Sequence, residues 1–203
     1  MWKLTIEDDE GKPTSLPLVH DEYTLGRGET NAIRLTDRNV SRKHSVLKKT
    51  DAGWVLSDQQ AHYLDQVAGT SALQSYNWVG QRIPLHATSN GKVLLSGVDR
   101  HTARALAGEL TAYTDKTIVD LTRLEAELAA TRRDGYATAV DELEDGLSAI
   151  AAPVRNAHGE VVNSLSLSGP TFRLDAARLL SLRTLLLPAA GEVSRRLGWR
   201  DQR

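Results

Sequence analysis

The feature that most constrains the fold of this chain is a change of sequence pattern near residues 54–66. Before it, short apolar segments with β-branched residues alternate with turns rich in Gly, Pro, Asp and Asn, and no helical period is present. After it, amphipathic stretches carry apolar residues three or four positions apart, which is the helical spacing. The two patterns predict a β-rich segment, residues 1–58, followed by an α+β segment, residues 59–203.

Composition and charge exclude several classes of function. The chain has 203 residues, no cysteine and a formal net charge of −1. The charge is balanced in both segments, with 9 Lys and Arg against 10 Asp and Glu in residues 1–58 and 16 against 16 in the rest. Disulfide and thiolate chemistry are therefore excluded, and neither a basic surface nor a helix-turn-helix pattern indicates direct DNA binding. No segment has the pattern of a membrane span or a signal peptide, so we expect a cytoplasmic protein without membrane contact.

Short strands are expected throughout residues 1–58, near positions 4–6, 16–19, 23–25, 32–35, 45–47 and 54–56. This spacing is typical of a sandwich-type β structure. Arg27 follows a glycine turn, and Ser41 and Arg42 follow a second loop, so strand pairing could bring all three to one rim. Residues 34–49 hold six basic side chains against one acid. An arginine fork with a neighbouring hydroxyl suits phosphate oxygens, so this rim is a candidate phosphate site.

The segments Tyr23–Leu35 and Val40–His44 resemble the forkhead-associated (FHA) domain, which binds phosphothreonine. The resemblance implies that Arg27, Ser41 and Arg42 hold the phosphate, while His44 supports the loop. It covers about half of that fold, because Gln59 and its successors stand where the family has an Asn-Gly loop that reads the peptide backbone. We expect a half-sandwich that binds a phosphothreonine peptide weakly or has lost that function. The alternative is a rim of solvated arginines.

Four helices and a hairpin are expected in the second segment. The first helix starts within residues 86–95, the second spans residues 99–110 with Asp99 as the cap, and the third spans residues 120–135 with Asp120 as the cap and Gly135 as the stop. The hairpin joins strands 147–155 and 160–168 through the turn 156–159. A C-terminal helix over residues 175–197 contains Pro188, which should kink or divide it.

The second strand of the hairpin has two different faces. Val161, Asn163, Leu165 and Leu167 alternate with Val162, Ser164, Ser166 and Ser168. Successive side chains of a strand point to opposite sides, so one face is mainly aliphatic and the other carries hydroxyl groups. These hydroxyl groups either line a polar cavity or face water.

Residues 61–199 resemble the effector-binding domain of IclR-type transcriptional regulators, without its first helix and without the DNA-binding domain. The motifs that carry the resemblance are Pro84-Leu-His-Ala-Thr88, Gly91-Lys92, Gly135-Tyr-Ala137, Ile150-Ala-Ala-Pro-Val154 and Ser166-Leu-Ser-Gly-Pro170. It implies a PAS- or GAF-like antiparallel sheet flanked by helices, which binds small carboxylates or aromatic acids and forms homo-oligomers. The effector-binding residues that it implies are Ser89, Asn90, Gly91, Ala149, Ser166 and Ser168. The family often has cysteine at the position of Ala149, so that donor is absent here.

The IclR-type pattern also includes a hairpin whose second strand ends in Tyr-Leu-Asp. Residues 53–67 have that shape, with Trp54-Val-Leu56 as the first strand. One strand could therefore serve both segments. If residues 54–58 pair with residues 61–67 in the structure, this strand is shared by the two segments.

No motif of a catalytic or metal site is present. The six histidines show no paired ligand spacing, and the nucleophile elbow, the Walker loop and the dinucleotide fingerprint are absent. His86 is expected to pack beneath a pocket, and the acids of residues 141–145 are expected to form a solvated loop. We therefore expect a non-catalytic chimera without cofactor or metal, in which an FHA fragment precedes a ligand sensor. The alternatives are a phosphothreonine-dependent interaction module and a recombined or engineered chain with no native ligand.

Overall fold

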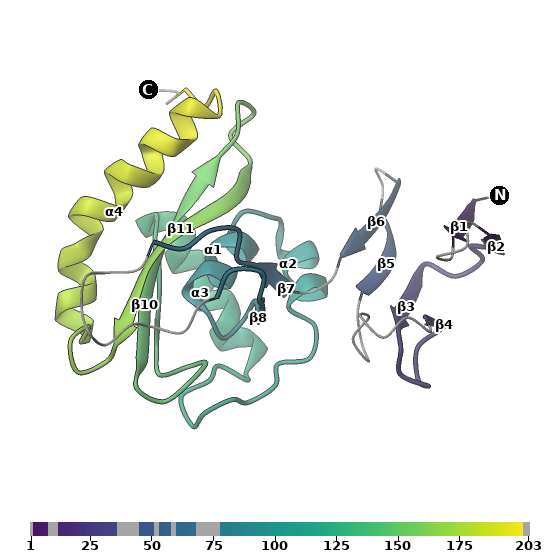
Figure 1. Ribbon diagram of the computed structural model, residues 1–203, viewed down its shortest axis with the longest axis horizontal. Coiled ribbons are helices and arrows are strands. Elements are labelled where there is room, and N and C mark those ends of the chain that lie inside the picture. Colours follow the sequence, from purple (N-terminus) through teal and green to yellow (C-terminus); the bar gives the residue numbers. More distant parts are fainter. Residues whose placement is uncertain are drawn as a thin grey trace. The chain divides into compact units, whose positions relative to one another are not determined.

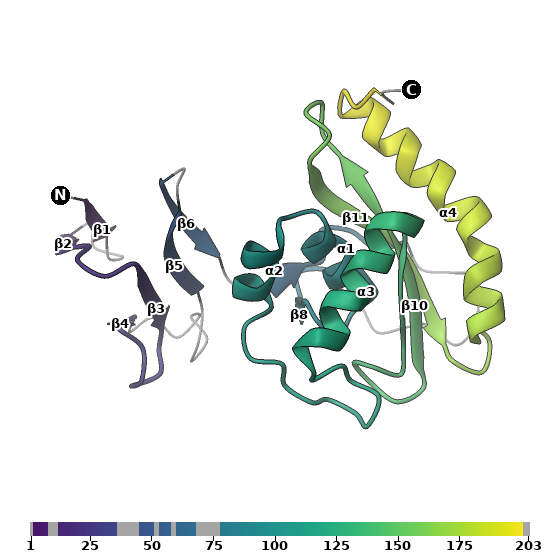
Figure 2. The same cartoon turned by 180° about the vertical axis from the view of Figure 1, so that it is seen from behind.

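The computed structural model describes residues 2–7, 12–35, 45–50, 53–57, 60–67 and 78–200. Contacts between Cα atoms divide the chain into two compact units, Met1–Gln59 and Gln60–Arg203, called here the first and the second unit. Figures 1 and 2 show the elements of each unit from opposite sides. Within the described residues, no helix has both the length and the apolar character needed to cross a membrane.

The described residues of the first unit form strands and turns. β1 (Lys3–Glu7) pairs with β2 (Pro13–Pro17), and a second sheet has the order β4-β3-β5-β6. Its strands are β3 (Glu22–Gly26), β4 (Ile33–Arg34), β5 (Ser45–Thr50) and β6 (Gly53–Ser57). The buried core of this unit consists of Leu25, Ile33 and Leu47, with Tyr23 and Trp54 packed against them.

The pairing of β6 answers the question about the shared strand. β6 runs antiparallel to β5, from Trp54 opposite Lys49 to Ser57 opposite Val46. Among the described strands, β7 (Gln60–His62) pairs only with β8 (Arg82–Pro84). The expected pairing of residues 54–58 with residues 61–67 is therefore not formed by the described residues.

The second unit has three layers. Its central sheet is antiparallel, with the order β11-β10-β9, and consists of β9 (Ala137–Val140), β10 (Leu147–Arg155) and β11 (Val161–Pro170). The helix α4 (Ala176–Arg196) lies along one face, and α1 (Ser89–Ser96) packs on the other (Figures 1 and 2). Beside α1 lie α2 (Arg100–Ala107) and α3 (Leu121–Asp134). This arrangement confirms a mixed α+β fold.

Local signals set the ends of the helices. The carboxylate of Asp99 accepts a hydrogen bond from the backbone N–H of Thr102 at 3.0 Å, and that of Asp120 accepts one from Arg123 at 2.7 Å. Such side-chain acceptors satisfy N–H groups that the first turn of a helix leaves unpaired. Gly135 ends α3 in the left-handed region, with φ of 77°. The caps predicted at these three positions are confirmed.

Pro188 does not divide the C-terminal helix. α4 continues through it as one helix from Ala176 to Arg196, so of the two expected effects, a kink or a division, the division does not occur. Pro188 and Thr184, whose carbonyl group lies one turn earlier, are both exposed. Water can therefore replace the hydrogen bond that the proline ring removes.

The β10–β11 hairpin turns its serine row toward α1. Ser168 lies opposite Ala149, and Ser166 lies opposite Ala151. On the same face Ser164 Oγ donates a hydrogen bond to Asn90 Oδ1 of α1 at 3.1 Å. Ser164 and Ser166 are thus half-buried on the side of the sheet that α1 covers, whereas Ser168, further along the same row, is exposed.

A bulge changes the expected faces of β11. The register shifts between Val154 and Arg155, and beyond this point Val161 packs against Val93 of α1 and Ala151. Leu165, by contrast, packs in the cluster beside α4. The assignment of Val161 to the face of Leu165 is therefore wrong, because one extra residue reverses the side to which a strand residue points.

Candidate functional site

A small cavity lies between the N-terminus of α1, the sheet, and aromatic side chains near β7 and β8. Eleven residues line it: Tyr63, Trp78, Ile83, Ala87, Thr88, Ser89, Ala139, Leu143, Leu147, Ala149 and Ser168. Its volume of about 30 Å³ is room for one or two water molecules. Three of the predicted effector-binding residues, Ser89, Ala149 and Ser168, are part of this lining.

The N-terminus of α1 lies at this cavity, since Thr88 and Ser89 are part of its lining. Thr88 is the N-cap, and its Oγ1 accepts a hydrogen bond from Gly91 N at 3.1 Å and donates one to Pro84 O at 2.9 Å. The backbone N–H groups of Ser89 and Asn90 have no acceptor in the described part of the chain. Because the helix dipole adds partial positive charge there, this end of α1 favours an anion.

Gly91 lets α1 approach the preceding loop closely. A Cβ atom at this position would lie 2.2 Å from Leu85 O and 2.4 Å from Leu85 Cα. These distances are far below van der Waals contact and involve backbone atoms, which cannot rotate away. The predicted role of Gly91 as an effector contact stays untested, but its role in seating α1 follows directly from this geometry.

A hydrogen-bonded network connects the remaining predicted residues. Asn90 Nδ2 donates to Tyr63 Oη at 3.0 Å, and Ser166 is hydrogen-bonded to the same hydroxyl group. Burial raises the pKa of Tyr63, and the hydrogen bonds with Ser166 and Asn90 work against this rise. The Tyr63 ring stacks on Trp78, with centroids 5.9 Å apart and planes at 28°. Asn90 and Ser166 therefore meet through Tyr63, at the aromatic wall of the cavity.

A buried ion pair ties α1 to the sheet beside the cavity. Lys92 is 1% exposed, and its Nζ donates to Glu142 Oε1 at 2.7 Å and to Thr138 O at 3.0 Å. Glu127 Oε2 lies 3.7 Å from the same nitrogen. Burial raises the pKa of Glu142, and the positive charge of Lys92 opposes that rise. The second carboxylate oxygen of Glu142 has no hydrogen-bond partner in the described structure. Lys92 is therefore the main group that stabilises the negative charge of Glu142.

The expectation of a solvated acidic loop is thus wrong for two of its four acids. Asp141 is 7% exposed, accepts from Lys116 Nζ at 2.6 Å and from Thr171, and has a positive φ of 55°. Glu142 is paired with Lys92, whereas the other two acids are exposed. The partners come from segments more than 20 residues away, which no local pattern indicates.

His86 is buried in the loop before α1, directly before the cavity residues Ala87 and Thr88 in the sequence. Its Nε2 lies 2.9 Å from Thr111 O, so the neutral ring donates this hydrogen bond. Burial lowers the pKa of His86, the bond to Thr111 raises it, and nearby Lys92 lowers it further. The pKa of His86 is therefore lower in the folded protein than in the unfolded chain. As the pH falls, the unfolded chain binds a proton at this residue before the folded protein does.

We therefore expect His86 to make the second unit less stable below about pH 6.5. Thermal unfolding of the parent chain and of His86→Gln, which keeps a donor for Thr111, should differ by an amount that changes between pH 7.5 and 5.5. The parent chain should lose more stability on acidification. Parallel curves over this range would show that His86 does not titrate as the structure predicts.

The predicted phosphate-binding residues of the first unit are not assembled by the described structure. Arg27 is exposed in the turn after β3. Ser41, Arg42 and His44 lie outside the described residues. The candidate phosphate rim is therefore untested.

Sequence reasoning missed most of the apolar wall of the cavity. Neither Tyr63 nor Trp78 was predicted to line a site, and Leu143 lies in the loop expected to be solvated. Thr88 carried a usable signal, because a hydroxyl residue directly before a helical stretch is a preferred N-cap. For the aromatic residues no local pattern distinguishes a cavity wall from a core.

Comparison with known proteins identifies relatives over most of the chain. The family model for the bacterial transcriptional regulator IclR C-terminal domain matches residues 45–195. The HTH-type transcriptional regulator XynR of Escherichia coli (strain K12) is 32% identical over 193 residues, which are 84% of this chain and 77% of XynR. The family match begins at β5 and therefore includes two strands of the first unit.

Solved structures share the fold. A transcriptional regulator from Rhodococcus sp. RHA1 is 31% identical with a TM-score of 0.65, covering 69% of this chain and 58% of its own. The inducer-binding domain of a PobR double mutant from Acinetobacter, in complex with 3-hydroxybenzoic acid, is 33% identical with a TM-score of 0.58. That match covers 74% of this chain and 82% of the PobR chain. The present chain thus spans little more than half the length of the Rhodococcus regulator.

Proposed function

The chain belongs to the IclR family of bacterial transcriptional regulators, by its match to the C-terminal effector-binding domain, and we propose that its second unit senses a small carboxylate or aromatic acid. The observation that carries this proposal is the cavity at the N-terminus of α1. There, unpaired N–H groups and the hydroxyl groups of Ser166 and Ser168 lie close to the rings of Tyr63 and Trp78.

These groups suit the two parts of an organic acid. The N–H groups of Ser89 and Asn90 and the hydroxyl of Ser168 can donate hydrogen bonds to a carboxylate, which are stronger than bonds between neutral groups. Trp78 and Tyr63 offer a flat apolar surface to the rest of the molecule. The complex of PobR with 3-hydroxybenzoic acid supports this ligand class. Ala149 contributes volume but no donor.

The cavity must widen when the ligand binds. Its volume of about 30 Å³ is far below the ~300 Å³ or more of typical ligand pockets. The stacked pair of Tyr63 and Trp78 forms its side wall, so separation of these rings is the simplest way to make room. Ligand binding would then change the surroundings of Trp78.

A thermal-shift screen with pyruvate, glyoxylate and aromatic acids tests the proposal. We expect at least one acid to stabilise the chain, because a ligand that binds only the folded state raises its melting temperature. In the double variant Ser166→Val and Ser168→Val the affinity for that acid should fall by about tenfold or more, since hydrogen bonds to the carboxylate are lost.

The matched control replaces two exposed hydroxyl residues of α4, Ser181→Val and Thr184→Val. This control should bind the acid as the parent chain does. A panel of acids without any effect, or a stabilising acid that the cavity variant binds unchanged, would contradict the proposal.

The relatives are regulators of transcription and not enzymes, and the proposed role is likewise non-catalytic and needs no cofactor. Effector domains of this family oligomerise, and we propose that this chain also forms a homo-oligomer. A cytoplasmic location and the absence of direct DNA binding complete the proposal. They rest on the sequence pattern and on the kind of protein that the relatives are.

The origin of the first segment stays a prediction. The family match begins at residue 45, so the boundary at residues 58 and 59 and the interpretation as a chimera with an FHA fragment are not shown. Of the four predicted phosphate-binding residues only Arg27 is described, and it is exposed. No observation favours phosphothreonine-peptide binding, so ligand sensing is the function proposed here.

A further inference from the structure

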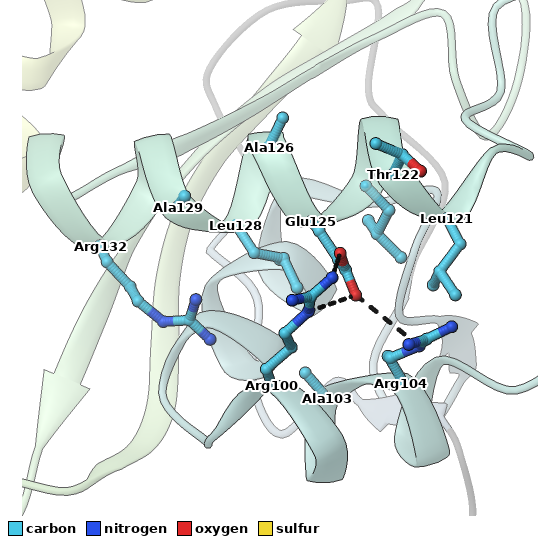
Figure 3. A pocket seen from close by; sticks show the side chains of 11 residues that line it. Arg100, Ala103, Arg104, Leu121, Thr122, Glu125, Ala126, Leu128, Ala129 and Arg132 are labelled. Carbon is cyan, nitrogen blue, oxygen red and sulfur yellow. Dashed lines mark hydrogen bonds and ion pairs between the residues drawn. The ribbon is translucent and has the colours of Figure 1, made fainter.

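A second and larger hollow lies on the surface of the second unit, between α2 and α3 (Figure 3). Its volume is about 370 Å³, within the range of small-molecule sites. The residues that line this groove are Arg100, Ala103, Arg104, Leu121, Thr122, Leu124, Glu125, Ala126, Leu128, Ala129 and Arg132. It shares no lining residue with the cavity of the proposed effector site.

The floor of the groove is apolar and well supported. Ala103, Leu124 and Leu128 are each no more than 3% exposed and belong to the main hydrophobic cluster behind the groove. Above this floor Leu121 is half-buried and Ala129 is exposed, so a ligand in the groove would cover apolar surface without displacing core side chains. An apolar body is therefore one requirement for an occupant.

The rim of the groove carries three arginines and one glutamate, which is a net charge of +2. Arg100 binds both oxygens of Glu125, at 2.9 and 2.6 Å, so this pair is internally satisfied. Arg132 donates through Nε and Nη2 to the carbonyl groups of Ser96 and Val98, both at 2.8 Å, which holds its guanidinium in place.

Arg104 differs from the other two arginines. Its Nε lies 3.7 Å from Glu125, beyond hydrogen-bond distance, and it has no hydrogen-bonded acceptor among the described residues. In Figure 3 a dashed line joins Nε of Arg104 to Glu125, and the end of the guanidinium points away from this acid. The rim therefore offers a planar set of donors that is not already used, which is the arrangement that binds carboxylates.

We propose that the groove between α2 and α3 is a second binding site, for an organic anion with a linear alkyl body, the chemistry of a medium-chain fatty acid. The body lies on the floor of Ala103, Leu124 and Leu128, and the carboxylate pairs with Arg104. The net positive rim excludes cations of the same shape. This site goes beyond the effector cavity and does not depend on it.

Calorimetric titration of the full chain with octanoate, and with octylammonium as the cation of matched length, tests this site. We expect octanoate to bind and octylammonium not to bind detectably. Arg104→Glu should weaken octanoate binding by about tenfold or more, because it reverses the charge that pairs with the carboxylate. Glu125→Gln should strengthen binding by about threefold, because it removes the acid that competes for the arginines.

Two controls separate this site from other surfaces. Arg178→Glu reverses an exposed arginine on α4, and the double variant Ser166→Val and Ser168→Val alters the effector cavity. Both should bind octanoate like the parent chain. Equal binding of the two amphiphiles, or equal affinity of Arg104→Glu and Glu125→Gln, would overturn the proposal. So would a change of oligomeric mass in Arg104→Glu with octanoate binding intact, since the groove would then be an interface between copies.

Discussion

Replacement of Gly91 by Ala is expected to destabilise the second unit by about 3 kcal/mol or more. The added Cβ would lie 2.2 Å from Leu85 O, where the neighbouring atoms are backbone atoms that cannot move independently. The helix α1 must therefore shift away from the loop that carries Thr88. The shift would loosen the N-cap and move the N–H groups that the proposed effector needs.

The measurement is thermal unfolding followed by the helical circular-dichroism signal, because the helices of the described structure all lie in the second unit. A loss of this size should lower the melting temperature by roughly 10 °C. Gly191→Ala is the matched control: it lies within α4, and its Cβ would contact only Arg195 Nη1, at 3.7 Å. This control should be stabilised by about 0.5–1 kcal/mol, since alanine favours a helix over glycine. A Gly91→Ala chain that melts like the parent would contradict the geometry of α1.

Replacement of Lys92 by Met should be the second most damaging change, with an expected loss of about 3 kcal/mol. Lys92 is the close positive partner of the buried Glu142 carboxylate, and its removal leaves that acid uncompensated. The double variant Lys92→Met and Glu142→Leu should recover much of this loss, because a buried pair replaced by apolar groups is often tolerated. Measuring the parent, both single variants and the double variant gives the coupling directly.

The loss in Lys92→Met should also depend on pH. Burial raises the pKa of Glu142 in the folded state, and removal of Lys92 raises it further. Below the unfolded-state pKa of about 4.3, the Glu142 carboxyl group is protonated in both the folded and the unfolded state, so burying it costs no ionisation energy. As the pH rises above this value, the unfolded state loses its proton more readily than the folded state, and the folded protein loses stability. The single variant should therefore approach the parent chain in stability near pH 4.5 and fall behind it at pH 7. A loss that is the same at both values would show that Glu142 does not titrate as expected.

The sequence predicted those features that depend on nearby residues. Asp99, Asp120 and Gly135 mark helix ends because caps and left-handed stops act within one turn. The row from Ser164 to Ser168 follows from the two-residue period of a strand, and the structure places it toward α1. The positions of Ser89, Ala149 and Ser168 at one cavity came from the family resemblance and not from any local pattern.

Features that depend on distant contacts were not predictable in this way. Lys92 and Glu142 are 50 residues apart, and each alone resembles a solvated charge. The bulge near Arg155 that reorients Val161 leaves no signature in an alternating strand. β6 pairs with β5 and not with residues 61–67. Which of these two partners is more stable depends on both of them, so the sequence of β6 alone does not predict it.

The most direct test of the proposed sensor follows the emission of Trp78. The chain has four tryptophans, and replacing Trp2, Trp54 and Trp199 by Phe leaves Trp78 as the single reporter in the cavity wall. Each acid of the thermal-shift panel is titrated into this variant. We expect a saturable change in Trp78 emission for the stabilising acid, at the concentration at which calorimetry shows binding, and we expect this change to be lost in the Ser166→Val and Ser168→Val background. Binding detected by calorimetry while the emission of Trp78 stays constant would place the ligand away from this cavity and contradict the proposed sensor site.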